Sequence, residues 1–382
     1  MPGRPLGLYL HVPFCARRCG YCDFNTYTAT ELGGSVRRDD FHAVLAAEVR
    51  FAAAELGDQA RPIDTVFVGG GTPTLLGASG LVALLDAVRS EFGLAPGAEV
   101  TTEANPDTVD GSFLEALLAG GYTRISFGMQ STAPNVLAVL DRTHAPGAGQ
   151  AAARAALAAG FAHVSLDLIY GTPGESDDDL RQSVSDAVET GVDHVSAYAL
   201  VVEDGTPLAR RVRRGEVPAP DDDVAATRYE IVDAVLRDAG YRWYEVSNWA
   251  RPGGACRHNL GYWHDDDWWG VGPGAHSHVG DERWWNVKHP ATYADRIATG
   301  QSPAAEREVL TAEQRAMERV MLGLRLAEGL EVRDLAPRAV PVAEEFVGDG
   351  LLDPSAWATD RLVLTDRGRL LADAVIRDLV SA

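Results

Sequence analysis

Over the first 240 residues, short apolar runs alternate with longer stretches in which apolar residues recur at helical spacing. The short runs predict six strands, at residues 7–12, 64–68, 99–103, 123–127, 163–168 and 194–199. The longer stretches predict six helices, at residues 40–56, 78–91, 110–118, 147–159, 177–189 and 223–239. Phe41, Leu45 and Val49, for example, share one face of a helix. Repeated strand–helix units of this kind indicate right-handed βαβ connections around a parallel sheet.

Six strand–helix units are two fewer than a complete (β/α)₈ barrel contains. We therefore expect an α/β fold built on a partial, TIM-like (β/α)₆ barrel over residues 1–240. A doubly wound open sheet is the alternative. The glycines at 69–71 lead into Thr72 and Pro73 and not into the GxGxxG helix start of a dinucleotide-binding domain, which weakens that alternative.

The pattern changes after residue 240. Seven of the eight tryptophans lie between residues 241 and 285, together with His258, His264, His276 and His278. Gly and Pro interrupt this stretch, so we interpret residues 241–309 as a structured, loop-rich extension that closes the barrel. Beyond it, helices are predicted at 312–326, 332–335, 341–348 and 367–380, with a strand at 361–364. Residues 310–382 are therefore expected to form a small, mainly helical, winged-helix-like domain.

Composition and charge narrow the class of protein. A chain with 46% hydrophobic and 23% charged residues is typical of a globular protein. The net charge of −21 argues against a nucleic-acid partner and against electrostatic adhesion to an anionic membrane. No apolar run reaches the ~20 residues that span a bilayer. Because the first residues also lack the pattern of a signal peptide, we expect a cytoplasmic protein without a transmembrane segment.

Three of the four cysteines form a C-x3-C-x2-C motif directly after the first predicted strand. They are Cys15, Cys19 and Cys22. Three thiolates on one loop can each bind one iron of a [4Fe–4S] cluster, which leaves the fourth iron open to another ligand. The alternative is a structural zinc site whose fourth ligand is Cys256 or a histidine.

The cysteine motif, with Tyr21 before its last cysteine, resembles the signature of radical S-adenosylmethionine (SAM) proteins. Residues 9–15 (YLHVPFC), 69–74 (GGGTPT), 127–130 (FGMQ) and 167–173 (DLIYGTP) are similar to the oxygen-independent coproporphyrinogen III oxidase group. Residues 258–263 (HNLGYW) resemble the HemW-type heme chaperone branch of that group. The resemblance covers essentially the whole chain. It implies a [4Fe–4S] cluster on Cys15, Cys19 and Cys22, with SAM bound at the open iron.

The resemblance also implies a set of SAM contacts. These residues are Tyr9, Tyr21, Gly70, Gly71, Thr72, Glu103, Gln130, Arg142 and Asp167. The motifs that carry them lie where predicted strands end, so they should converge at one face of the barrel. Glu103 could bind the ribose hydroxyls, and Arg142 could pair with the methionine carboxylate. Taken alone, Glu103 and Asp167 would more often be helix caps or ion pairs at the barrel rim.

Two departures from the oxidase pattern favour the chaperone branch. The oxidase has a fourth cysteine where this chain has Phe24, and it has an N-terminal extension where only fourteen residues precede Cys15. We therefore expect a heme chaperone that delivers heme to acceptor proteins. An oxygen-independent coproporphyrinogen III oxidase is the alternative, so enzyme activity is left open. An electron donor and a second copy of the chain are further candidate partners.

The aromatic segment offers several candidate heme ligands. We consider His258 as the axial ligand and Cys256 as a weaker candidate, among tryptophans that could contact a macrocycle. The alternative for His258 is a purely structural role, in which the HNLGYW segment seals the mouth of the barrel. A third class of protein, one merely stabilised by zinc, would require the cofactor motifs to be coincidental.

Overall fold

The computed structural model describes residues 4–32, 36–142 and 145–382. Within these residues the main sheet has twelve strands, in the order β12-β11-β10-β9-β1-β2-β3-β4-β5-β6-β8-β7. Its centre consists of parallel strands in sequence order: β1 (Leu6–Val12), β2 (Ile63–Gly70), β3 (Leu94–Ala104), β4 (Arg124–Gln130), β5 (His163–Tyr170) and β6 (His194–Ala199). The predicted partial barrel is confirmed.

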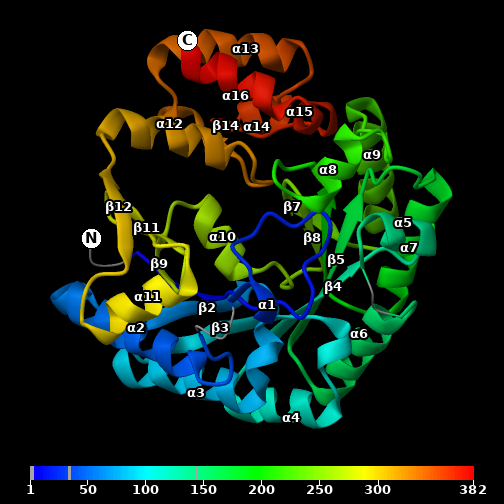
Figure 1. Ribbon diagram of the computed structural model, residues 1–382. Helices are drawn as coiled ribbons and strands as arrows, with labels where there is room; N and C mark the ends of the chain where they lie inside the picture. The colour runs from blue at the N-terminus through cyan, green and yellow to red at the C-terminus, as the bar shows by residue number, and fades with distance from the viewer. Residues whose placement is uncertain (1–3, 33–35, 143–144) are drawn as a thin grey trace.

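The helices that connect these strands lie along the outer side of the curved sheet (Figure 1). They are α2 (Phe41–Leu56), α3 (Gly77–Glu91), α4 (Gly111–Gly120), α6 (Ala148–Ala159), α7 (Asp177–Glu189) and α9 (Asp222–Asp238). Three short helices in this part of the chain were not predicted: α1 (Ala29–Leu32), α5 (Pro134–Val139) and α8 (Pro207–Arg213). Because the connecting helices share one side of the sheet, the doubly wound alternative is wrong.

The aromatic-rich segment extends the sheet at both ends, which differs from the loop-rich region predicted. β9 (Asp267–Val271) pairs in parallel with β1, and β10 (His276–Val279), β11 (Glu282–Asn286) and β12 (Ala304–Val309) continue antiparallel beyond it. β7 (Arg242–Glu245) and β8 (Asn248–Ala250) add to β6 at the other end. The short helix α10 (Arg257–Trp263) lies inside the arc of the sheet (Figure 1).

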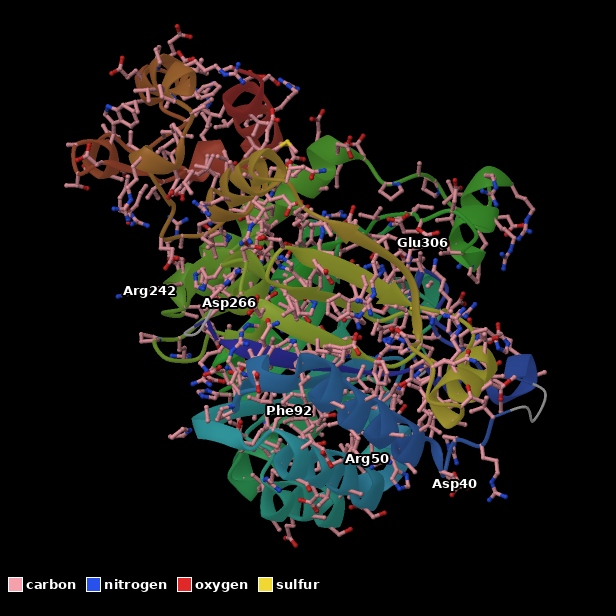
Figure 2. All side chains as sticks on the ribbon, turned by 90° about the vertical axis from the view of Figure 1, so that its left-hand side faces the viewer. Asp40, Arg50, Phe92, Arg242, Asp266 and Glu306 are labelled. Atoms are coloured by element: carbon pink, nitrogen blue, oxygen red, sulfur yellow. The ribbon has the colours of Figure 1, made fainter. Side chains whose placement is uncertain are left out.

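The C-terminal elements form a group to one side of β9–β12 (Figure 2). They are α12 (Ala312–Gly323), β13 (Leu330–Glu331), α13 (Val340–Gly348), α14 (Pro354–Trp357), β14 (Arg361–Leu362), α15 (Asp366–Leu370) and α16 (Ala372–Ser381). The preceding helix, α11 (Pro290–Ala298), is not part of this group and packs on α2. The group has its own cluster of buried apolar side chains. The single helix expected at 367–380 breaks at Leu371, and the one at 332–335 is a 3₁₀ turn, Val332–Asp334. The boundaries at 240 and 310 stay predictions.

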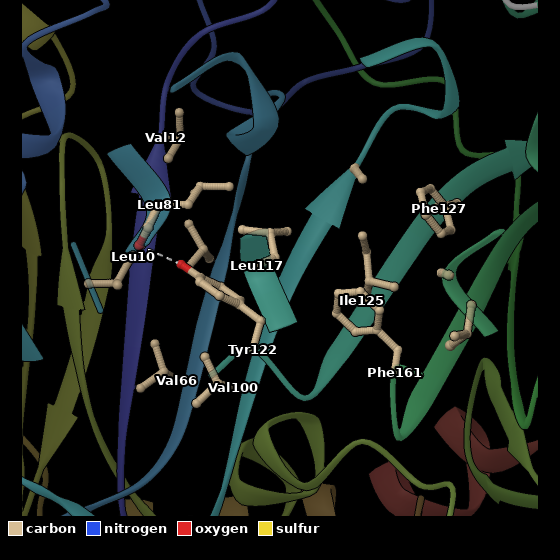
Figure 3. Packing of buried hydrophobic residues seen from close by; sticks show 14 of the residues in the cluster. Leu10, Val12, Val66, Leu81, Val100, Leu117, Tyr122, Ile125, Phe127 and Phe161 are labelled. Carbon is tan, nitrogen blue, oxygen red and sulfur yellow. Dashed lines mark hydrogen bonds between the residues drawn. The ribbon is translucent and has the colours of Figure 1, made fainter. Parts of the chain in front are cut away.

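The main core lies between the parallel strands and the outer helices (Figure 3). In β1, alternate residues point outward into this core and are fully buried: Leu6, Leu8, Leu10 and Val12. Burying one such side chain stabilises the fold by roughly 1.5–3 kcal/mol. The residues between them, such as Tyr9, face the inside of the arc, so the same alternation that builds the core also places polar side chains in the interior. No helix in the described part of the chain is long and apolar enough to cross a membrane.

Candidate functional site

A cavity of about 490 Å³ opens inside the arc, where the parallel strands end. Every residue predicted for the cluster, SAM or heme lines it. These are Tyr9, Cys15, Cys19, Tyr21, Cys22, Gly70, Gly71, Thr72, Glu103, Gln130, Arg142, Asp167 and His258. The convergence follows from the parallel register, since Val12 of β1 pairs with Gly70 of β2 and the strand ends therefore lie side by side.

The loop after β1 carries three free, half-buried thiols, Cys15, Cys19 and Cys22. Backbone hydrogen bonds fix this loop: the Cys15 amide donates to Tyr27 O at 3.0 Å, and the Cys22 amide donates to Cys19 O at 3.3 Å. Burial raises the pKa of the Cys22 thiol to about 11 and also raises the pKa of Cys15. Both thiols are therefore neutral at pH 7 until positive charge, such as that of iron, compensates the thiolates.

The glycine turn after β2 packs directly against the cysteine loop. The Gly71 amide donates to Val12 O at 2.8 Å, and the Thr72 amide donates to Phe14 O at 2.7 Å. A Cβ at Gly71 would lie 2.4 Å from Phe14 O and 3.0 Å from the Cys15 sulfur. Only glycine fits there, so this turn positions the cysteines as well as leaving backbone free to approach a ligand.

Two carboxyl groups, those of Glu103 and Asp167, line the cavity. Burial, and then the nearby Asp167, raise the pKa of Glu103 to about 8, although the Gly70 amide donates to Glu103 at 3.1 Å. Burial raises the pKa of Asp167 to about 6, against hydrogen bonds from Ser196 and Ser126. Because an adjacent cation would lower both pKa values, this pair fits a cationic ligand such as the sulfonium of SAM.

Arg142 and Gln130 form another wall of the cavity. Arg142 donates from Nη1 to the Cys19 sulfur at 3.3 Å and from Nη2 to Gly128 O at 2.6 Å, while its Nε is buried without a partner. Gln130 has a left-handed backbone (φ 66°), which is uncommon for a residue other than glycine. A buried cation with an unused N–H is suited to a carboxylate, as predicted for the methionine end of SAM.

The two tyrosines predicted near the cofactors lie on different walls. The Tyr9 hydroxyl is 3.0 Å from His11 Nδ1, and its ring stacks on Phe67 on the inner face of the sheet. Tyr21 lies within the cysteine loop and packs against the apolar cluster around Val136 and Leu140 of the α5 segment.

His258 occupies the cavity floor and has no free ring nitrogen. Its Nδ1 is 2.8 Å from the Thr65 hydroxyl, its Nε2 is 2.8 Å from the Tyr262 hydroxyl, and its ring stacks on Phe67. Burial lowers the pKa of His258 to about 4, so the ring is neutral. Binding to a heme iron would require breaking one of two buried hydrogen bonds, and this geometry favours the structural alternative for His258.

Cys256 lies deeper than the other cysteines. Its thiol contacts the Glu99 carboxylate at 3.5 Å, and Glu99 pairs with Thr65 in the strand register. Thr65 lies four residues before Gly69, which is near the end of β2 beside the cysteine loop, so about 13 Å of strand separates the two positions. Cys256 therefore cannot complete a zinc site with Cys15, Cys19 and Cys22. Within the described residues, no three His, Cys, Asp or Glu side chains are grouped around a single metal position.

Sequence reasoning missed the polar floor of the cavity. Thr101 Oγ1, Arg124 Nη1 and His194 Nδ1 are buried there without hydrogen-bond partners. Arg124 pairs with Glu99 at 3.1 Å and donates to Gly254 O at 2.8 Å. The signal was available, because Glu99, Thr101 and Glu103 alternate along one strand and must share its inner face. The floor, the thiols and the carboxyl pair together fit the cluster and SAM expected from the sequence.

Comparison with known proteins identifies the family of the chain. The model of the Radical SAM superfamily matches residues 9–187. The chain is 61% identical to the heme chaperone HemW of Mycobacterium tuberculosis over 380 residues, covering 100% of this chain and 96% of the relative. It is 34% identical to the heme chaperone HemW of Escherichia coli, covering 97% of each.

Among solved structures, the coproporphyrinogen III oxidase HemN of Escherichia coli, described as a radical SAM enzyme, superposes with a TM-score of 0.85. The match covers 100% of this chain and 91% of that one. At 23% sequence identity, it shows that the two chains share a fold.

Proposed function

Because the chain belongs to the radical SAM superfamily and, within it, to the family of HemW heme chaperones, we propose that it binds a [4Fe–4S] cluster, SAM and heme, and delivers the heme to acceptor proteins. The observation that carries the proposal is the convergence of the three motif cysteines and the nine predicted SAM-site residues on one cavity. It occurs in a chain that is 61% identical, over its whole length, to a protein named as a heme chaperone.

The cysteine loop would hold three irons through Cys15, Cys19 and Cys22. When bound, the cluster supplies an electron and an open iron position for SAM. Arg142, which contacts the Cys19 sulfur and has an unused Nε, is placed to hold the SAM carboxylate beside that iron. Glu103 accepts a hydrogen bond from the Gly70 amide, and its other oxygen is available for the ribose hydroxyls.

Position 24 supports the chaperone over the oxidase. Phe24 lines the cavity mouth with 61% of its surface exposed, so no fourth thiol stands beside the cluster loop. An exposed phenyl ring adds apolar surface there and has no acid–base or redox chemistry. The same proposal includes an electron donor for the cluster, assembly of the chain into a homodimer, and a cytoplasmic location.

Anaerobic reconstitution with iron and sulfide, followed by two parallel assays, tests the proposed function. Protein titrated with heme should develop a Soret band and should lose it when an apo-globin is added as a model acceptor. The same preparation, supplied with SAM and a reductant, should leave coproporphyrinogen III unchanged. Formation of protoporphyrinogen IX, or failure to bind heme, would overturn the chaperone proposal.

A further inference from the structure

One histidine differs from all the others in the described part of the chain. Eight histidines have a ring nitrogen in a hydrogen bond or ion pair: His11, His42, His163, His194, His258, His264, His278 and His289. His276 has none among the described residues, and it is exposed. A ligand can therefore reach an imidazole nitrogen of His276 without breaking an existing contact.

His276 lies on the inner face of the sheet extension. It pairs with Trp285 across β10 and β11, and the two rings stack with centroids 5.7 Å apart and planes 25° apart. On the same face, Trp268 contacts Tyr262 of α10, the helix inside the arc. The opposite face carries Trp284, which is buried against Trp269. Trp285 is only half-buried, so an indole remains available beside the free imidazole.

Lys288, the only lysine in the chain, lies two residues after the end of β11. It is exposed and makes no ion pair within the described residues. Asn25 Nδ2 donates to Lys288 O at 2.8 Å, and the Tyr27 hydroxyl donates to the same oxygen at 3.3 Å, so this segment is tied to the cysteine loop. Although the side chain is exposed, its partial desolvation beside Trp285 and the nearby Lys288 charge lower the pKa of His276, which keeps its imidazole neutral at pH 7.

Negative and positive side chains lie on different sides of His276 and Trp285. Glu306 of β12, labelled in Figure 2, stands opposite Trp285 in the register and carries a negative charge on that side. Arg283 is already paired with Glu308 and Glu318. Lys288 therefore remains the available cation beside His276, and an anionic group would orient towards it and away from Glu306.

We infer that the surface formed by His276, Trp285 and Lys288, here called the β10–β11 surface, is where the heme cargo docks. His276 supplies a nitrogen to the heme iron, Trp285 contacts the apolar macrocycle, and Lys288 pairs with a propionate. A neutral imidazole, an aromatic ring and a lone ammonium match the three chemical parts of heme. The inference rests on the proposed function, because it assigns a site for the heme that function requires.

The first test is a heme titration of His276→Ala, monitored by the Soret band. The band should shift and the affinity should fall, and free imidazole should restore the wild-type spectrum by replacing the missing ligand. His264→Ala is the matched control, because this exposed imidazole already bonds Glu328 at 2.9 Å. His264→Ala should bind heme like the wild type.

The second test separates the propionate contact from the iron contact. Lys288→Gln should weaken heme binding by about two- to five-fold, as expected for an exposed ion pair. The same variant should bind heme dimethyl ester, which lacks the propionate charges, as tightly as the wild type does. Lys288→Arg, which keeps the charge, should retain most of the affinity for heme.

The outcomes distinguish this inference from the proposed function. If the wild-type protein binds no heme, the proposed function fails and the inference fails with it. If the wild type binds heme but His276→Ala binds with the same spectrum and affinity, only the inference is overturned. Iron content and far-UV circular dichroism should match the wild type in each variant, since all the substituted side chains are exposed.

Discussion

Glu103 has surroundings that favour its neutral form. Its pKa rises from the ordinary value of 4.5 to about 8, mainly through burial and also through Asp167. Between these two values the folded state binds more protons than the unfolded state, so this group makes the fold less stable as pH rises from about 4.5 to about 8.

Glu103→Gln should remove that pH dependence. Thermal denaturation of the cluster-free protein should show a difference in Tm, variant minus wild type, that grows from pH 5 to pH 8. Comparing the two proteins cancels the opposite contribution of buried neutral histidines such as His258, whose lowered pKa costs stability as pH falls. A difference in Tm that stays constant across this range would contradict the assignment.

Glu103 should also contribute directly to SAM affinity. The positive charge of bound SAM lowers the pKa of Glu103, and a hydrogen bond to the resulting carboxylate is worth about 1.5–3 kcal/mol. Glu103→Ala should therefore weaken SAM binding by roughly ten- to a hundred-fold, at about 1.4 kcal/mol per factor of ten. Calorimetry on the reconstituted protein measures this, with the exposed Glu91→Ala as a control that should bind SAM normally. Unchanged affinity in a folded Glu103 variant would remove this residue from the site.

The cysteines divide into cluster ligands and a buried thiol. Anaerobically purified protein should contain about four irons per chain, as a [4Fe–4S] cluster requires. Cys22→Ser should abolish the cluster. Cys256→Ser should retain it, because Cys256 contacts Glu99 on the cavity floor. Iron and sulfide analysis with visible absorption checks both variants, and loss of iron from the Cys256 variant would show that the ligand set is different.

At the scale of helices and strands, sequence patterns were sufficient to predict some elements and not others. β1 to β6 were predictable because each is a short apolar run followed by a long amphipathic helix. β9 was missed because Gly270 and Gly272 come directly after its tryptophans and suggested a loop. α10 was missed as a helix because it has only seven residues and ends in aromatic side chains. Its contacts with β2 and β3 are long-range, and local spacing carries no information about them.

β9 and β10 approach too closely for a side chain at Gly270. A Cβ there would lie 2.2 Å from His276 O, which is a backbone atom and cannot move aside without shifting β10. Gly270→Ala should destabilise the protein by roughly 1–3 kcal/mol, as overpacking does. Gly111→Ala is the control, because a Cβ at Gly111 would meet nothing within 4 Å. Urea denaturation compares the two, and equal stability would show that β10 adjusts without cost.

At the scale of the whole molecule, the sequence predicted the barrel and its cavity better than the way its parts are joined. The cavity residues were predictable because motifs at strand ends must meet in a parallel sheet. The contact between the C-terminal elements and the barrel was not, since it depends on single polar side chains. Arg369 of α15 binds both oxygens of Asp233 on α9, at 3.1 and 3.0 Å, and covers the Trp243 ring.

Removal of Arg369 should loosen that contact. Breaking a buried ion pair from one side costs roughly 3–5 kcal/mol. Asp233 keeps its hydrogen bonds with Arg237 and Trp249 when Arg369 is removed. Arg369→Ala should therefore lower the free energy of unfolding by about 3 kcal/mol or less. Arg377→Ala, which removes a largely exposed pair with Asp378, should cost under about 1 kcal/mol. Urea denaturation and limited proteolysis measure the stability of both variants. Equal losses of stability would contradict a stabilising role for the contact between Arg369 and Asp233.

The single lysine has a practical consequence for studying this protein. An amine-reactive dye or crosslinker has one side chain to modify, Lys288, in a chain whose other basic residues are arginine or histidine. The α-amino group has a lower pKa, about 8 against about 10.4 for lysine, so labelling at different pH values distinguishes the two amines. A fluorophore attached at Lys288 would stand beside Trp285 and the cysteine loop without any engineered cysteine. The natural sequence therefore provides one defined side chain for labelling in studies of partner proteins in solution, while acylation of Lys288 removes the charge that we assign to a heme propionate.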